Sequence, residues 1–164
     1  MLKYIILFVV VVLCGYIGYG FSNYYTSRKN FFKSLELLFD KLKTEISFSQ
    51  SKLIEILNGF SAHSKDAKKF VCNYVNCLNF DKTLNLENIF DGIKILNEDE
   101  KNIILTFTKT LGKFDAPRQA DQLAAQKNEL SSLYKKAEED AKKYGSLYIK
   151  LGIILGLVIA LIFA

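Results

Sequence analysis

Hydrophobic positions are concentrated at the two ends of the chain. Residues 4–21 and residues 151–164 contain no charged side chain, and the stretch between them has the mixed composition of a water-soluble domain. A helix that spans a bilayer needs about 20 mostly apolar residues. The first segment nearly meets that length, and the second meets it if residues 145–150 are added and Lys150 extends its charge to the headgroups. We therefore predict a transmembrane helix at each end.

Small residues recur at helical spacing inside both apolar segments. Gly152 and Gly156 are four residues apart, and Cys14 and Gly18 form a looser pair of the same kind. Small side chains at this spacing allow helices to approach closely in lipid. A cleaved signal peptide is the alternative for the first segment, but the small residues of a cleavage site are hard to place there. We therefore expect an uncleaved anchor.

Between the two ends, apolar residues recur with the 3.6-residue period of an α-helix, and no stretch alternates long enough to predict a strand. The first of these helices is expected to continue straight out of the apolar segment. Asn97 and Glu100 have the spacing of a capping box at the start of the fifth helix, and Asp115 is expected to cap the last one. The predicted helices before the last one cover residues 31–46, 53–57, 62–80, 86–96 and 98–111.

The last helix carries the most regular pattern. Its apolar positions follow a four-three rhythm that is typical of a heptad seam and is interrupted at Lys127. At 1.5 Å per residue the seam is a rod of roughly 48 Å. The pattern predicts an all-α protein: a cytosolic bundle of about six helices at residues 23–146, with long antiparallel first and last helices, between transmembrane anchors at residues 1–22 and 147–164. The seam positions are Ala116, Ala120, Leu123, Leu130, Tyr134, Ala137, Ala141, Tyr144 and Tyr148.

Charge favours a membrane partner over a nucleic acid. The net charge is +5, but between the apolar ends 22 − 2 = 20 basic residues face 17 acidic ones, which is a mixed surface and not a phosphate-binding stripe. Basic residues gather where the middle domain meets the predicted membrane, so this domain should lie on the cytoplasmic side and contact anionic lipid headgroups. The acidic run at residues 138–140 is interpreted as a solvated helix face. The basic residues assigned to the membrane surface are Arg28, Lys29, Lys33, Lys142, Lys143 and Lys150.

The sequence shows no pattern that indicates catalysis. It has no phosphate-binding loop, one histidine, His63, in a polar turn, and three cysteines whose spacing suits neither a metal site nor a redox pair. We therefore predict no catalytic residue, metal, cofactor or small-molecule substrate. An enzyme that acts at the membrane surface through Glu45 or His63 is the least favoured alternative.

Four residues are candidates for contacts with another protein. Glu45 lies near the end of the first soluble helix, where the apolar register turns it partly inward. Phe114 and Asp115, with Gln119 after them, lie at the corner that precedes the last helix. An ordinary helix–turn–helix corner is the alternative interpretation, but a phenylalanine in a tight turn is suited to contact a partner.

Several segments of the chain resemble the stage III sporulation protein AB family of endospore-forming bacteria. They are Gly15-x-x-Gly18-x-Gly20 followed by Arg28, the segment Lys-Thr-Glu-Ile-Ser-Phe at residues 43–48, Leu-Gly-x-x-Asp at residues 111–115 with Gln119, and residues 144–152 at the entry to the last apolar segment. The family often has a proline after its Glu-Ile-Ser segment, whereas this chain has Gln50-Ser51-Lys52.

The resemblance implies a function that the patterns above do not reach. Members of the family belong to a secretion-like channel that joins mother cell and forespore, and their helical domain is similar to the cytoplasmic domains of type II secretion and type IV pilus platform proteins. It implies a multi-pass protein of the mother-cell membrane whose partners are other channel subunits, including a secretion-type ATPase and membrane proteins. A generic membrane-tethered adaptor unrelated to sporulation is the alternative, and a gene neighbourhood without sporulation genes would favour it.

Overall fold

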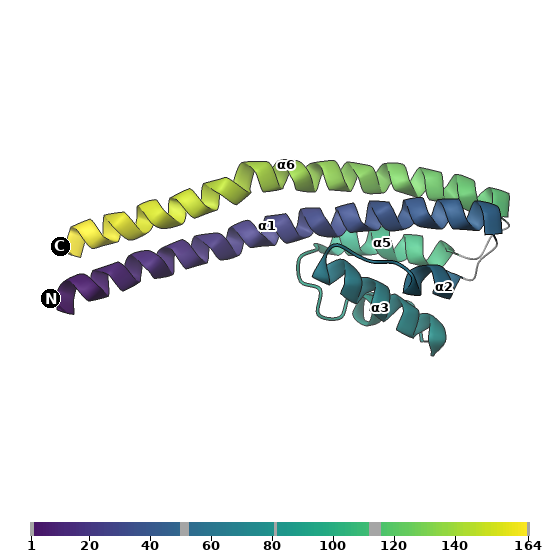
Figure 1. The fold of residues 1–164 in the computed structure, drawn as a ribbon, viewed down its shortest axis with the longest axis horizontal. Helices are drawn as coiled ribbons and strands as arrows, with labels where there is room; N and C mark the ends of the chain where they lie inside the picture. The colour runs from purple at the N-terminus through teal and green to yellow at the C-terminus, as the bar shows by residue number, and fades with distance from the viewer. Residues whose placement is uncertain (1, 50–52, 81, 112–115, 164) are drawn as a thin grey trace. The chain divides into compact units, whose positions relative to one another are not determined.

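A computed structural model describes the backbone of residues 2–49, 53–80, 82–111 and 116–163, and the side chains within residues 7–45, 53–80, 82–111 and 121–163. Across these ranges the regular elements are α-helices and no strand occurs. The all-α fold class predicted from the sequence is therefore confirmed. The helices, shown in Figure 1, are α1 (Leu2–Ser49), α2 (Leu53–Asn58), α3 (Lys65–Asn79), α4 (Leu86–Ile89), α5 (Glu98–Thr110) and α6 (Ala116–Phe163).

The chain divides into two compact units. The paired-helix unit comprises residues 1–29 and 136–164, and the bundle unit comprises residues 30–135. Both α1 and α6 contribute to each unit, because neither helix is interrupted within its bounds. The expected unbroken exit of the first helix from its apolar segment is thus confirmed. The membrane boundaries at residues 22 and 147 stay predictions.

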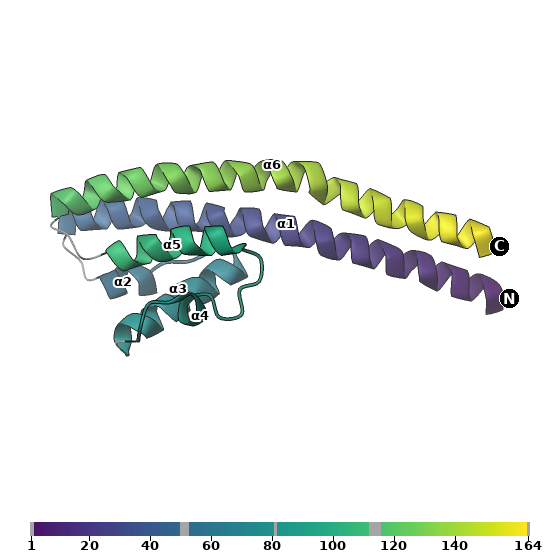
Figure 2. The same cartoon turned by 180° about the vertical axis from the view of Figure 1, so that it is seen from behind.

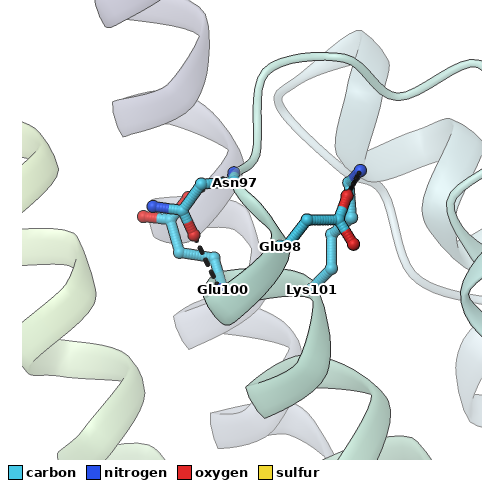
Figure 3. A network of polar contacts seen from close by, with 4 residues as sticks. All are labelled: Asn97, Glu98, Glu100 and Lys101. Carbon is cyan, nitrogen blue, oxygen red and sulfur yellow. Dashed lines mark hydrogen bonds and ion pairs between the residues drawn. The ribbon is translucent and has the colours of Figure 1, made fainter.

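The start of α5 has the predicted capping box. The side-chain oxygen of Asn97 accepts a hydrogen bond from the backbone N–H of Glu100 at 2.8 Å, and the Glu100 carboxylate accepts one from the backbone N–H of Asn97 at 3.1 Å (Figure 3). Two N–H groups that the helix cannot pair internally are satisfied in this way. Glu98 instead forms an ion pair with Lys101 at 2.8 Å on the helix surface. Spacing in the sequence therefore located this helix start correctly.

The fourth helix is shorter than predicted. Asn85 caps α4 by accepting a hydrogen bond from the N–H of Asn88, but α4 ends at Ile89, and the chain up to residue 96 is not helical. Gly92 has a φ of +64°, a left-handed conformation that a helix does not contain and that glycine adopts without steric cost. Ile93 and Leu96 are nevertheless buried. The apolar spacing thus predicted burial correctly and backbone conformation incorrectly.

Aromatic side chains hold the bundle unit together. Phe31 of α1 meets Phe70 of α3 edge-on with ring centroids 6.0 Å apart, and Phe39 meets Phe107 of α5 at 5.8 Å. Figures 1 and 2 show α5 and α1 side by side within this unit. Burial of several large aromatic rings dominates the energetics of a small core. The largest fully buried side chains are Phe31, Phe32, Leu35, Leu38, Leu42, Ile56, Leu57, Tyr74, Ile89, Ile104, Leu123 and Leu130.

Polar contacts also join helices inside the bundle unit, and two of them change the pKa of a side chain. The buried hydroxyl of Tyr74 donates a hydrogen bond to the carbonyl oxygen of Thr108 at 2.9 Å, and desolvation by burial raises the pKa of this phenol. On the surface, the Lys127 ammonium donates to the Asp40 carboxylate, an interaction that raises the pKa of Lys127. Lys127 is the interruption in the heptad rhythm of the last helix. It therefore connects α6 to α1 by an exposed ion pair, whereas its neighbours in the heptad rhythm, Leu123 and Leu130, are buried.

Candidate functional site

In the paired-helix unit, α1 and α6 run antiparallel and side by side (Figures 1 and 2). A Cβ atom added to Gly18 would lie 2.5 Å from the carbonyl oxygen of Tyr148, and one added to Gly152 would lie 2.6 Å from that of Cys14. A Cβ on Gly156 would lie 2.9 Å from the Cα of Val11. Only hydrogen atoms fit at these places. The two backbones are therefore in direct contact along a glycine seam, which we define as Cys14, Gly18, Gly152 and Gly156.

The seam joins the two small-residue pairs that the sequence contains. Spacing alone predicted that each pair allows a close approach of helices, and left open which helix each pair would meet. The structure shows that they meet each other, since the pair on α1 faces the pair on α6. Gly20 lies off the seam, because a Cβ added there would have no neighbour within 4 Å. The first and last apolar segments thus form one antiparallel pair of helices, which we call the hairpin.

Aromatic rings continue the contact beyond the glycine seam. The ring centroids of Phe21 and Tyr148 are 5.3 Å apart, and Tyr25 lies 5.8 Å from Tyr148 and 5.4 Å from Tyr144. A largely apolar cleft of about 510 Å³ opens beside them. Aromatic residues with a polar tip are enriched where a membrane helix meets the headgroups. The cleft is lined by Ile17, Gly20, Phe21, Tyr24, Tyr25 and Tyr148.

An ion pair joins the helices next to this aromatic cluster. The Arg28 guanidinium donates to the Asp140 carboxylate at 2.8 Å, and the Arg28 side chain is only 9% exposed. A buried arginine requires such a partner, because burial of an uncompensated charge is costly. Arg28 thus lies between the helices, whereas the sequence assigned it to the membrane surface. Asp140 likewise faces α1, although its acidic run was interpreted as a solvated face.

The other predicted membrane-surface residues lie on the outside of the molecule. Lys29 is half-buried, whereas Lys33, Lys142, Lys143 and Lys150 are exposed. Two of them make local contacts: Lys142 forms an ion pair with Glu138 at 3.4 Å, and the Lys143 ammonium lies 5.1 Å from the centre of the Tyr144 ring. Their binding of anionic headgroups stays a prediction.

The outer surface of the hairpin is apolar. Phe8, Leu161 and Ile162 are 70%, 79% and 72% exposed, respectively. The most apolar windows of α1 and α6 have mean hydropathies of 1.5 and 2.4, and only 6% of each window is buried. A core helix of a soluble protein would bury most of such a stretch. By length and composition, both helices could cross a membrane.

Comparison with known protein families identifies the family of this chain. The family model described as Stage III sporulation protein AB (spore_III_AB) matches residues 3–164. The chain belongs to the stage III sporulation protein AB family. The match extends over both apolar segments as well as the bundle unit, so the family assignment applies to the whole hairpin. No curated protein and no solved structure matches the chain.

Membership in the stage III sporulation protein AB family assigns this chain a role in sporulation and confirms the resemblance seen in the sequence. The family is a structural one and not a known family of enzymes. In the part of the chain that the structure describes, no group of three histidine, cysteine or acidic side chains is placed to hold a metal ion. His63 is exposed in the turn before α3. Of the cysteines, Cys14 is half-buried, Cys72 is exposed and Cys77 is buried.

The docking candidates of this sporulation protein are only partly visible. Phe114 and Asp115 lie outside the described residues, and Gln119 belongs to α6 but its side chain is not described. Glu45 is half-exposed on α1 and lies 3.6 Å from Lys41, one turn earlier. Their docking role therefore stays a prediction.

Proposed function

We propose that the chain is a structural assembly subunit of a secretion-like channel between mother cell and forespore. The observation that carries the proposal is the family match over residues 3–164, which includes both helices of the hairpin. A hairpin that joins the two ends of one chain by backbone contact is suited to hold a subunit in a membrane. The family match also favours this function over a tethered adaptor unrelated to sporulation.

The proposed location is the mother-cell membrane, with the bundle unit on the cytoplasmic side. Exposed lysines support this orientation, because basic residues next to a membrane helix are retained in the cytoplasm. The exposed Lys142 and Lys143 follow the bundle unit on α6, and the exposed Lys33 lies at its start on α1. Each exposed lysine near an anionic surface contributes about 1 kcal/mol to membrane attraction.

The proposed action is binding and not catalysis. Other channel subunits, including a secretion-type ATPase and membrane proteins, are the expected partners, and the corner with Phe114, Asp115 and Gln119 is the expected docking site together with Glu45. The exposed polar turn around His63 and the separated cysteines support this proposal, because neither arrangement suits a nucleophile or a metal.

A deletion and complementation experiment tests the function. A strain that lacks the gene should form few heat-resistant spores, and the full-length chain should restore them and co-purify with the secretion-type ATPase from sporulating cells. A variant with Phe114→Ala and Asp115→Ala should still insert into the membrane but fail in both assays. Glu129→Ala, at an exposed position of α6, is the matched control and should behave as the parent chain. Normal spore formation without the gene would refute the function, and normal spores with the double variant would refute the docking site.

A labelling experiment tests the orientation. In a cysteine-free variant, a single cysteine at position 63 should react with an impermeant maleimide only after the cells are opened, because the bundle faces the cytoplasm. A cysteine at position 164 should react from the outside of intact cells. Reaction of both sites only in opened cells would mean that the second apolar segment re-enters the cytoplasmic face and does not span.

A further inference from the structure

A charged side chain lies at one end of the glycine seam. Gly18 of α1 packs against Tyr148 and Gly152 of α6, so Lys150 lies at the same level of the hairpin as Gly18. Lys150 is exposed on the outer surface, whereas Gly152 lies against α1. The charge is therefore directed to whatever surrounds the hairpin at this level.

Exposed tyrosines mark the same level on the other helix. Tyr16 and Tyr19 flank Gly18 on α1 and are 73% and 59% exposed. Tyrosine prefers the boundary between hydrocarbon and headgroups, because its ring is apolar and its hydroxyl needs a polar partner. The ammonium of Lys150 and this pair of phenols thus favour a membrane boundary near Gly18, closer to the chain ends than the boundaries at residues 22 and 147 that composition predicts.

The apolar length beyond this boundary is short. On α1, residues 4–17 separate the boundary from Lys3, and these 14 residues extend about 21 Å. On α6, residues 151–163 form the matching apolar run, and their large side chains are mostly exposed. The hydrocarbon core of a typical bilayer is about 30 Å thick. Counted from the level of Gly18 and Lys150, the apolar length is therefore about 9 Å shorter than a typical bilayer requires.

We propose that the hairpin fits a bilayer whose hydrocarbon core is thinner than average, and that Lys150 sets this thickness. The proposal rests on the proposed function, because it requires that the hairpin lies in a membrane. A hydrophobic segment that is too short for its bilayer is accommodated by local thinning of the lipid or by bending of a flanking charged side chain towards the headgroups. Because Tyr16, Tyr19 and Lys150 lie at one level, the surrounding lipid is expected to become thinner to match the protein.

Reconstitution into vesicles of defined thickness tests the proposal. The full-length chain is mixed with phosphatidylcholines whose monounsaturated acyl chains lengthen stepwise from myristoleoyl to erucoyl, and the fraction that floats with the vesicles and resists alkaline extraction is measured. We expect this fraction to be highest with the shortest chains and to fall several-fold towards the longest. Lys150→Leu should move the optimum to longer chains. Lys136→Leu, at an exposed position 14 residues earlier on the same helix, should leave the optimum where it is.

The outcomes separate this inference from the proposed function. Equal insertion across the series for the parent chain and Lys150→Leu would overturn the inference, because the lysine would then simply bend its charge into the headgroups of any bilayer, while the membrane anchor itself would stand. Failure to insert into every vesicle, with normal helix content by circular dichroism, would overturn the membrane anchor and this inference with it. Equal helix content of the two lysine variants shows that a shift in the optimum is not a folding defect.

Discussion

Gly152→Ala should loosen the helical hairpin, and the structure sets the size of the effect. The added Cβ would lie 2.6 Å from the Cys14 carbonyl oxygen, whereas ordinary contacts of this kind begin near 3.4 Å. The helices must therefore separate locally by 3.4 − 2.6 = 0.8 Å. A gap of that size removes about a quarter to a half of the dispersion energy of the atoms it parts. Overpacking of this kind typically costs about 1–3 kcal/mol.

Gly20→Ala is the matched control. Both substitutions replace a helical glycine by alanine, so both gain the same intrinsic helix stability of about 1 kcal/mol. Gly20 differs only in its surroundings, because a Cβ there would meet no atom within 4 Å. Relative to this control, Gly152→Ala should therefore raise the ratio of unpaired to paired hairpin by about 5- to 150-fold, which corresponds to 1–3 kcal/mol.

Distances between spin labels measure this change. Labels at positions 8 and 161, both on the outer surface of the hairpin, are introduced into a chain whose three cysteines are alanines, and the protein is reconstituted in vesicles. The parent and Gly20→Ala should give one narrow distance distribution in double electron–electron resonance. Gly152→Ala should add longer distances. Identical distributions for the two alanine variants would refute the backbone contact at the seam.

Three further predictions concern contacts described above, each measured by chemical denaturation followed by circular dichroism. Asp140→Ala should lower the free energy of unfolding by about 3 kcal/mol, because the buried Arg28 guanidinium loses this carboxylate. Apolar replacement of both residues should recover most of that free energy. A decrease smaller than that for an exposed ion pair would contradict the burial argument. Tyr74→Phe should cost about 1 kcal/mol at neutral pH. Because the folded state raises the pKa of Tyr74, the unfolded chain loses this proton first, so the parent should lose up to about 1.4 kcal/mol of stability per pH unit above pH 10 from this group, and the variant should lack this contribution. Asn97→Ala should cost about 1 kcal/mol through loss of the capping box, whereas the exposed Asp99→Ala should change little; equal effects would argue against the cap.

Much of the helical fold could be predicted because its causes are local. The capping box at Asn97 depends on residues three apart, and the buried stripes depend on a period of 3.6. The predicted length of the fourth helix was wrong because Gly92 adopts a positive φ, which a helix does not contain. Ile93 and Leu96 are still buried in the core. Apolar spacing predicts which side chains are buried, but it does not distinguish a helix from an irregular segment that buries the same residues.

The polar contacts between the long helices could not be predicted, because they depend on register. Arg28 and Asp140 are 112 positions apart, and nothing near either residue identifies the other. Their pairing requires the alignment of α1 and α6 that the contact of Gly18 with Gly152 produces. Membrane-surface assignments based on charge alone consequently placed Arg28 outside. A pair of small residues in each apolar segment, Cys14 with Gly18 and Gly152 with Gly156, is the sequence signal from which this alignment can be proposed.

The glycine seam also has a consequence for biosynthesis. The residues that meet in it lie at opposite ends of the chain, since Gly152 is made 152 − 18 = 134 positions after Gly18. At a translation rate of about 5–20 residues per second, the first helix waits roughly 7–27 seconds for its partner. Under the proposed membrane location, the glycine face of this helix meets lipid during that interval, so a lone helix is inserted first and the hairpin closes only after Gly152 has been made.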